Sequence, residues 1–366
     1  MAQGILDILS GQARGAGPGA LRTMLLLAEG PYRVAMRLRR WAYRCHLLPS
    51  ADATVPVVSI GNITTGGTGK TPMVAWLVRR LREMGHHPAV LMRGYKSVAG
   101  KSDEAEMLRI ELGRPAGLMP RSARQALAVP LPSDVPVFPQ ADRRAAAREA
   151  VGAGADVLVM DDGFQHLRLR RDLDIVLIDA TCPFGFGHVL PRGLLREPLA
   201  ALHAADVLII THADAVDAAE LADLREELVA RTGRATIYAA AHRPTKLSDQ
   251  NGDVHEYGEL AGKRVLAFCG LGNPQSFFNT LKSMGAVLAA AQAFPDHVRY
   301  GPRELGELEK LSAKTGAQIV ITTQKDTIKL PLGWLSRPLW KLAVEMEITE
   351  GRAELLERIQ NTVKQT

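Results

Sequence analysis

The sequence is short of cysteine and has no long uninterrupted apolar run. Its three cysteines stand far apart, at positions 45, 182 and 269 of 366 residues. Such a set forms neither a disulfide framework nor the spacing of a zinc site, and it suits a reducing cytosol. No stretch of about 18 apolar residues occurs, so we expect no helix that crosses a membrane. The first 20 residues are rich in glycine and lack the apolar core of a secretory signal.

The chain also lacks a basic surface spread over its whole length. Residues 1–50 hold seven arginines and two acidic residues, which account for +5 of the net charge of +6. One basic segment of this kind is not the extended positive surface of a nucleic-acid-binding protein, and we expect no nucleic-acid partner. The length of 366 residues is enough for two domains with a sizeable core.

The basic segment has the pattern of an amphipathic helix over residues 31–48. Its arginines repeat at helical spacing, at Arg33, Arg37, Arg40 and Arg44. A neighbouring apolar stripe consists of Val34, Leu38, Trp41, Cys45 and Leu48. Arginine next to Trp41 and Tyr43 is typical of a helix that lies in a membrane interface and is attracted by anionic lipid. The alternative is a helix packed on its own domain, with a solvated arginine face.

A glycine-rich stretch at residues 59–72 is the most informative motif. An apolar run at residues 55–60 precedes it and an apolar-periodic segment follows it, which is the strand, loop and helix order of a phosphate-binding loop. Lys70 is then expected to reach the β- and γ-phosphates, and the Thr71 hydroxyl to ligate Mg²⁺. The expected nucleotide-binding residues are Thr64, Thr65, Gly66, Gly67, Thr68, Gly69, Lys70 and Thr71. Thr64 departs from the usual glycine, so a turn that only caps a helix is the alternative.

A second apolar run, at residues 156–160, leads directly into Asp161 and Asp162. A carboxylate at the tip of such a strand holds Mg²⁺ opposite the loop hydroxyl in phosphate-loop proteins. Adjacent residues of an extended segment point in opposite directions, so we expect one of the two to face the metal. The alternative is a pair of exposed turn acids.

Apolar runs alternate with helical patterns along the rest of the chain. This arrangement predicts an α/β fold with a mostly parallel sheet, of the phosphate-loop NTPase type, with helices on both faces. Ligands are then expected at the carboxyl ends of the strands. We expect an N-terminal membrane-associating segment at 1–50, a nucleotide-binding domain at 51–242 and a smaller α/β domain at 243–366.

From about residue 20 to about residue 350, the chain resembles the tetraacyldisaccharide 4′-kinase family, which acts in lipid A biosynthesis. The resemblance rests on eight motifs in a fixed order, at residues 61–72, 93–95, 102–104, 161–166, 190–198, 270–274, 294–297 and 323–326. It implies transfer of the ATP γ-phosphate to the 4′-hydroxyl of a tetraacyldisaccharide 1-phosphate, giving lipid IVA, with ATP and Mg²⁺ as cofactors. It also implies a cleft between two domains and a peripheral position on the cytoplasmic face of the bacterial inner membrane. We expect a monomer.

The resemblance also implies roles for individual residues. Asp103 matches the family's catalytic carboxylate and His297 its dyad partner, while Lys70 and Arg196 serve the phosphates. Positioning roles follow for Arg93, Glu104, Gln165, His166 and Glu197. The sequence departs from the family pattern at Leu194, where proline is usual, and at residues 96 and 97.

Two other functions compete with this interpretation. A nucleotide-switch GTPase or metallochaperone would use a similar phosphate loop, and residues 211–214 faintly resemble a guanine-reading motif with His212 in place of its lysine. A non-catalytic peripheral membrane protein with a retained nucleotide fold is the second, and it would leave Asp103 and His297 without a purpose.

Overall fold

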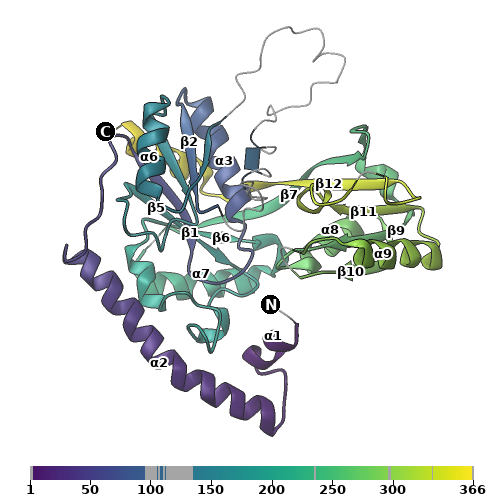
Figure 1. The fold of residues 1–366 in the computed structure, drawn as a ribbon, viewed down its shortest axis with the longest axis horizontal. Coiled ribbons are helices and arrows are strands. Elements are labelled where there is room, and N and C mark those ends of the chain that lie inside the picture. The colour runs from purple at the N-terminus through teal and green to yellow at the C-terminus, as the bar shows by residue number, and fades with distance from the viewer. Residues whose placement is uncertain are drawn as a thin grey trace. The chain divides into compact units, whose positions relative to one another are not determined.

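The computed structural model describes residues 3–94, 105, 108, 109, 112, 135–234, 236–295, 298–331 and 333–364. The chain forms two compact units (Figure 1). The smaller unit consists of Met1–Ala13 and His242–Glu345, and the larger unit of Arg14–Ala241 and Met346–Thr366. Each contains mostly parallel strands with helices, which confirms the predicted fold class.

A parallel sheet forms the centre of the larger unit. Among the described residues its strands follow the order β7-β6-β5-β1-β4-β2-β3, and each neighbouring pair is parallel. The strands are β1 (Val57–Asn62), β2 (Pro88–Met92), β3 (Val137–Pro139), β4 (Val157–Asp161), β5 (Leu173–Asp179), β6 (Val207–Thr211) and β7 (Tyr238–Asp249). Every residue of β1, β2, β4 and β6 is buried, as expected for parallel strands covered on both sides.

Helices cover both faces of this sheet. One face carries α3 (Lys70–Glu83) and α11 (Arg352–Lys364), and the other carries α6 (Arg143–Gly152) and α7 (Ala218–Thr232). Successive residues of β1 enter the two cores in turn. Val58 and Ile60 pack with α3, whereas Val57 packs with α6, because side chains alternate along a strand.

The smaller unit repeats this architecture with strands in the order β10-β9-β11-β12-β7. The additional strands are β8 (Val254–His255), β9 (Arg264–Cys269), β10 (Val287–Ala293), β11 (Ile319–Thr323) and β12 (Leu339–Glu350). Val265 and Cys269 face α8 (Pro274–Ser283), while Leu266 and Phe268 face α9 (Pro302–Thr315). Strands β7 and β12 have residues in both units.

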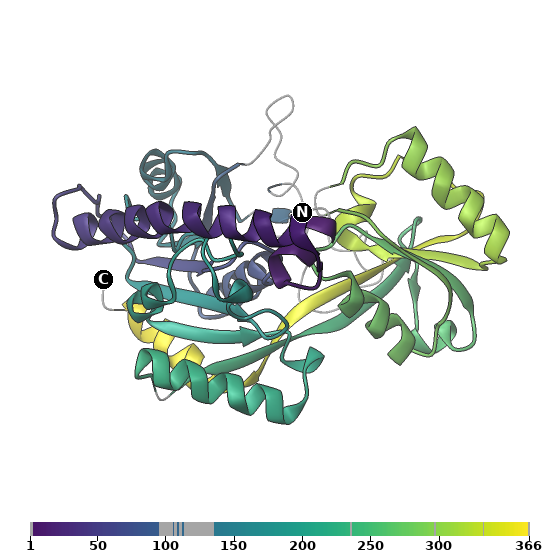
Figure 2. The ribbon, with the colours of Figure 1, turned by 90° about the horizontal axis from the view of Figure 1, so that it is seen from below.

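The basic N-terminal segment is part of one long helix, α2 (Ala16–Arg44), which runs along the outside of the larger unit and continues through Pro31 (Figure 2). Its apolar stripe is exposed to solvent, since Val34, Leu38 and Trp41 are 54%, 57% and 56% exposed. These three residues therefore do not pack on the domain, although other residues of α2 do contact the larger unit, among them Arg39 and Arg40. None of the described helices combines the length and apolar character needed to cross a bilayer.

Candidate functional site

The glycine-rich loop joins the carboxyl end of β1 to the first residue of α3, Lys70. Gly66 and Gly69 have φ angles of 141° and 80°, in the region that favours glycine, and Gly69 caps the helix. The loop therefore turns sharply into a helix N-terminus, where unpaired N–H groups and the helix dipole attract phosphate. The Thr211 hydroxyl, at the end of β6, donates to the Thr68 carbonyl at 3.1 Å and fixes the far side of the loop.

The segment 194–196 runs beside the glycine-rich loop. The Thr65 N–H donates to the Leu194 carbonyl, and the Arg196 N–H donates to the Ile63 carbonyl, both at 2.7 Å. These bonds form a short antiparallel pairing that delivers the Arg196 side chain to the rim of the loop. Leu194 uses its own N–H to donate to the Gly185 carbonyl at 2.9 Å, a bond that the family's usual proline lacks.

The side chain of Lys70 bends back over the loop. Its Nζ atom donates to Asn62 Oδ1 at 3.2 Å and lies 3.6 Å from Asp162 Oδ1. Asn62 is in turn oriented by its own Nδ2, which donates to the Thr64 carbonyl at 2.9 Å. The ammonium group is thus held where a triphosphate on the loop would meet it.

Asp162 is the anionic centre of the site. It follows β4 with a φ of 51°, and Arg196 Nη1 lies 2.9 and 2.7 Å from its two carboxylate oxygens. Burial raises the pKa of Asp162, but Lys70 and Arg196 outweigh burial and hold that pKa below its ordinary value. The carboxylate is therefore ionised and positions two cations beside the loop.

The turn after Asp162 is tightly packed on β1. A Cβ atom on Gly163 would lie 2.5 Å from Ser59 Oγ, and one on Gly61 would lie 2.5 Å from Phe164 Cβ. Glycine at both positions lets the Asp161–Asp162 segment approach the phosphate loop closely, which explains two glycines of the sequence motifs.

Arg143, which no sequence motif indicated, holds the turn at Asp161 and Asp162 through a backbone contact. It opens α6, is 3% exposed, and donates from Nη2 to the Asp161 carbonyl at 2.7 Å. Burial lowers the pKa of Arg143, while Asp161 and Asp162 act in the opposite direction. An arginine at a helix start is usually solvated, so the sequence carried no signal for this role.

Gln165 and His166 follow on the same turn. Gln165 Nε2 donates to the Asn62 carbonyl at 2.8 Å, so its side chain secures the end of β1. Burial, followed by nearby arginines such as Arg143, lowers the pKa of His166 to about 4. His166 is therefore neutral at pH 7. The positioning roles implied for both residues stay predictions.

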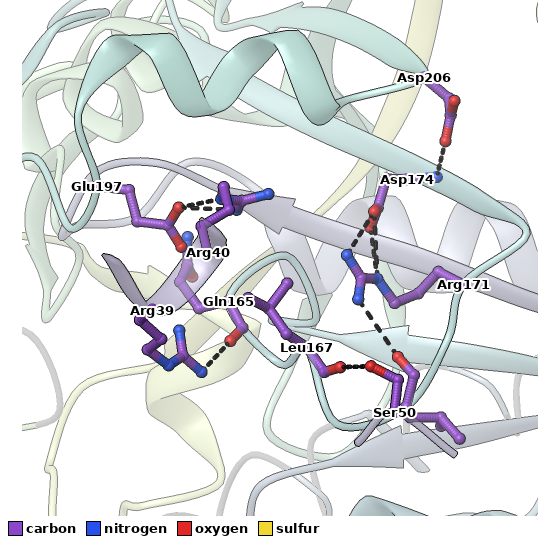
Figure 3. A network of polar contacts seen from close by, with 10 residues as sticks. Arg39, Arg40, Ser50, Gln165, Leu167, Arg171, Asp174, Glu197 and Asp206 are labelled. Carbon is purple, nitrogen blue, oxygen red and sulfur yellow. Dashed lines mark hydrogen bonds and ion pairs between the residues drawn. The ribbon is translucent and has the colours of Figure 1, made fainter. Parts of the chain in front are cut away.

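Glu197 is 2% exposed and pairs with Arg40 of α2 at 2.7 Å (Figure 3). Helical spacing predicted that Arg40 lies on a lipid-attracting arginine face, whereas in the structure its side chain points toward the protein. Arg33 likewise pairs with Glu29 of the same helix. Two of the four arginines on that face thus have protein partners.

The remaining candidates divide into two groups. Arg93 lies exposed just after β2, and Thr71 is the second residue of α3. The proposed catalytic pair Asp103 and His297 lies outside the described residues, as does Glu104.

The donor set at this edge of the sheet suits Mg²⁺. The Thr71 hydroxyl and the carboxylates of Asp161 and Asp162 are hard oxygen ligands, and Mg²⁺ commonly takes one or two carboxylates together with substrate phosphates. No group of three or more histidine, cysteine or acidic residues that could hold a metal occurs within the described ranges.

The guanine-reading alternative finds no support in the geometry of His212. This residue is 6% exposed, and its Nδ1 lies 3.1 Å from Asp179 Oδ1. Burial raises the pKa of Asp179, but its bond to His212 contributes to a net lowering. His212 is therefore tied to the end of β5 and does not extend toward a base as the lysine of that motif would.

Comparison with known proteins bears on the family to which the chain belongs. The model of the family described as tetraacyldisaccharide-1-P 4′-kinase matches residues 21–364. The chain is 43% identical over 327 residues to a tetraacyldisaccharide 4′-kinase of Anaeromyxobacter dehalogenans strain 2CP-C, covering 86% of this chain and 83% of the relative. It is 38% identical to one from Geobacter sulfurreducens, covering 93% of each.

A solved structure is also similar. The crystal structure of LpxK from Aquifex aeolicus in complex with ATP matches with a TM-score of 0.67 and 26% identity, covering 94% of this chain and 99% of that one. With a family model that spans nearly its whole length and relatives of about 40% identity, the chain belongs to the tetraacyldisaccharide-1-P 4′-kinase family.

Proposed function

We propose that this protein is an ATP-dependent kinase that transfers the γ-phosphate of ATP to the 4′-hydroxyl of an acylated disaccharide 1-phosphate. The observation that carries the proposal is the arrangement of Lys70, Asp162 and Arg196 around a glycine loop at a helix N-terminus. Phosphoryl transfer depends mainly on positioning and on cations that meet the charge developing on the phosphoryl oxygens. Lys70 and Arg196 are suited to that task.

The loop residues 64–71 would cradle the phosphates, and Thr71 with Asp161 or Asp162 would hold Mg²⁺. When bound, Mg²⁺ neutralises phosphate charge. Asp162 keeps Lys70 and Arg196 in place through its ionised carboxylate. Because these residues come from one chain, we infer that a monomer has a complete phosphate site.

Acceptor activation is assigned through the family resemblance to Asp103, with His297 as its partner. A histidine beside a carboxylate keeps it ionised and oriented toward a hydroxyl proton. Asp103→Ala should lower turnover more than ATP affinity. A variant that loses ATP binding but keeps normal turnover of the bound complex would contradict this role.

The decisive assay incubates purified protein with radiolabelled ATP and a micellar acylated disaccharide 1-phosphate, with labelled GTP as the control. We expect label in the lipid from ATP. Hydrolysis of GTP without lipid labelling would support the nucleotide-switch alternative.

The exposed side of α2 supports peripheral association with a membrane, and the family resemblance implies the cytoplasmic face of the inner membrane. Met24, Leu27, Val34, Leu38 and Trp41 form one stripe at helical spacing, and each is at least 54% exposed. Arg37 and Arg44 are exposed on the same helix and would meet anionic lipid. A substrate with several acyl chains stays in the bilayer, so an enzyme that lies on the bilayer surface can reach it.

The association is tested with point variants, because deletion of α2 would also remove the partner of buried Glu197. The double variant Leu38→Ser/Trp41→Ser should lower partitioning onto anionic vesicles by about tenfold or more, since each side chain loses apolar burial of about 1 kcal/mol or more. Unchanged partitioning would contradict the proposal. Neutral vesicles separate the apolar contribution from that of the arginines.

A further inference from the structure

Helix α2 contacts both segments that build the charged centre of the site. One segment follows β4 and carries Asp162, and the other borders the phosphate loop and carries Arg196. The side chains of Asp162 and Arg196 meet each other at 2.7 Å. The geometry of this pair therefore depends on how the two segments are held together.

Arg40 bridges these segments. Its Nε atom donates to Glu197 Oε2 at 2.7 Å, and its guanidinium lies 4.6 Å from the centre of the Phe164 ring. Glu197 directly follows Arg196, and Phe164 is two residues after Asp162. One side chain thus contacts a neighbour of each member of the Asp162–Arg196 ion pair. Figure 3 shows its contact with Glu197.

The Arg40–Glu197 contact is well shielded from water. The side chains are 18% and 3% exposed. In the described part of the chain, Glu197 Oε1 has no hydrogen-bond partner, so compensation of this buried charge rests on Arg40. Shielded pairs of this kind are geometrically specific, because an unpaired buried carboxylate is strongly unfavourable.

Two further bonds from α2 act on the same segments. The Tyr32 hydroxyl donates to the Arg196 carbonyl at 2.8 Å, and Arg39 donates to the Gln165 carbonyl at 2.8 Å. Tyr32 therefore holds the backbone of Arg196 itself, while Arg196 holds Asp162.

We propose that Arg40 and Tyr32 are positioning residues, which set the Asp162–Arg196 pair at the phosphate loop from a helix that is not part of that loop. The inference rests on the proposed function for its kinetic consequence. It assigns to α2 a role in turnover that is separate from membrane association, because Tyr32 and Arg40 face the protein and the apolar stripe faces away.

The test uses full-length protein with ATP and the acylated disaccharide 1-phosphate dispersed in neutral detergent, so that membrane binding does not enter. Arg40→Gln should lower kcat by about 10- to 100-fold while the KM for ATP changes by less than about threefold, because small misplacements of a catalytic group act on the transition state. Tyr32→Phe removes one oxygen and should lower kcat by about three- to tenfold. The control Arg170→Gln breaks an exposed ion pair with Asp52, at 3.0 Å, and should leave kcat unchanged.

Two double variants separate positioning from simple loss of structure. Tyr32→Phe should have little further effect on kcat in an Arg196→Ala background, and equal effects in both backgrounds would overturn the inference. Arg40→Gln/Glu197→Gln replaces the ion pair with two amides and should recover part of the kcat lost in Arg40→Gln. If the kcat losses of Arg40→Gln and Glu197→Gln simply multiply in the double variant, the two residues act independently and the inference is overturned.

Hydrogen exchange gives a readout that needs no lipid substrate. Amides of residues 194–197 should exchange faster in Tyr32→Phe and Arg40→Gln than in the wild type or in Arg170→Gln. Unchanged exchange would overturn the inference even in an active enzyme. Faster exchange in the variants, together with a wild type that labels no lipid, would instead contradict the proposed function.

Discussion

Both units of this protein place an acidic residue at the carboxyl ends of parallel strands, but the two acids have different surroundings. In the larger unit, Asp162 is contacted by two side-chain cations, Lys70 and Arg196. In the smaller unit, Asp326 is fully buried and accepts hydrogen bonds from the Gly270 N–H at 2.9 Å and the Thr323 hydroxyl at 2.8 Å.

Asp326 joins two of the sequence motifs of the smaller unit, at residues 270–274 and 323–326. Gly270 follows β9, Thr323 ends β11, and a Cβ atom on Gly270 would lie 3.3 Å from the carbonyl of Pro295, after β10. Burial, followed by the Asp326 carboxylate, raises the pKa of the adjacent Tyr300. Asp326 thus ties the loop that follows β9 to the end of β11.

Under the proposed function, this difference separates a structural acid, Asp326, from a functional one, Asp162. Backbone and hydroxyl donors around Asp326 cannot leave without unfolding the loops. The cations around Asp162 are flexible side chains that a triphosphate can attract away. Under the proposed function, the same strand-end position therefore serves stability in one unit and nucleotide binding in the other.

The largest expected difference is in kcat, between a variant that lacks Lys70 and a variant that lacks Lys329. Lys70 and Lys329 each lie 3.6 Å from their aspartate. Lys70→Met should lower kcat by about 100- to 1,000-fold, because a cation that meets the transition-state charge is lost. The matched variant Lys329→Met should keep kcat in its folded fraction. Steady-state kinetics checks both, and near-normal turnover of Lys70→Met would break the comparison.

Asp326→Ala should lower the free energy of unfolding by about 3–5 kcal/mol, because buried donors lose their acceptor. Urea unfolding measures the change. Asp162→Ala should show a clearly smaller loss of stability together with loss of activity. Equal destabilisation by both substitutions would show that Asp162 is as structural as Asp326.

The free energy of unfolding should fall at acidic pH because of His166, which lies in the candidate site. Its pKa is about 4 in the folded protein and about 6.5 in the unfolded chain, so the unfolded chain takes up the proton first as pH falls. The stabilisation is complete above pH 6.5 and is lost progressively toward pH 4, by about 1–3 kcal/mol. Urea titrations at pH 7, 6 and 5 should show this slope, and His166→Gln should flatten it. An equal slope in the variant would assign the effect to other groups.

Local sequence predicted much of the site. The glycine loop, Lys70 and the two aspartates lie within short segments whose spacing is tied to strand and helix ends, so their meeting at one edge of a parallel sheet was expected. The Arg40–Glu197 bond joins residues 157 positions apart, and the Arg143 contact depends on where α6 packs. No local pattern distinguishes such arginines from solvated ones.

The sequence by itself determined the α/β class, the phosphate loop and the amphipathic character of α2, because alternation, glycine positions and helical spacing are properties of neighbouring residues. Only the tertiary structure decided which side of α2 faces the protein and that α11 packs on the larger unit. Those outcomes depend on contacts between residues far apart in the sequence. Buried charges must be paired, and apolar side chains from distant segments must pack into one core.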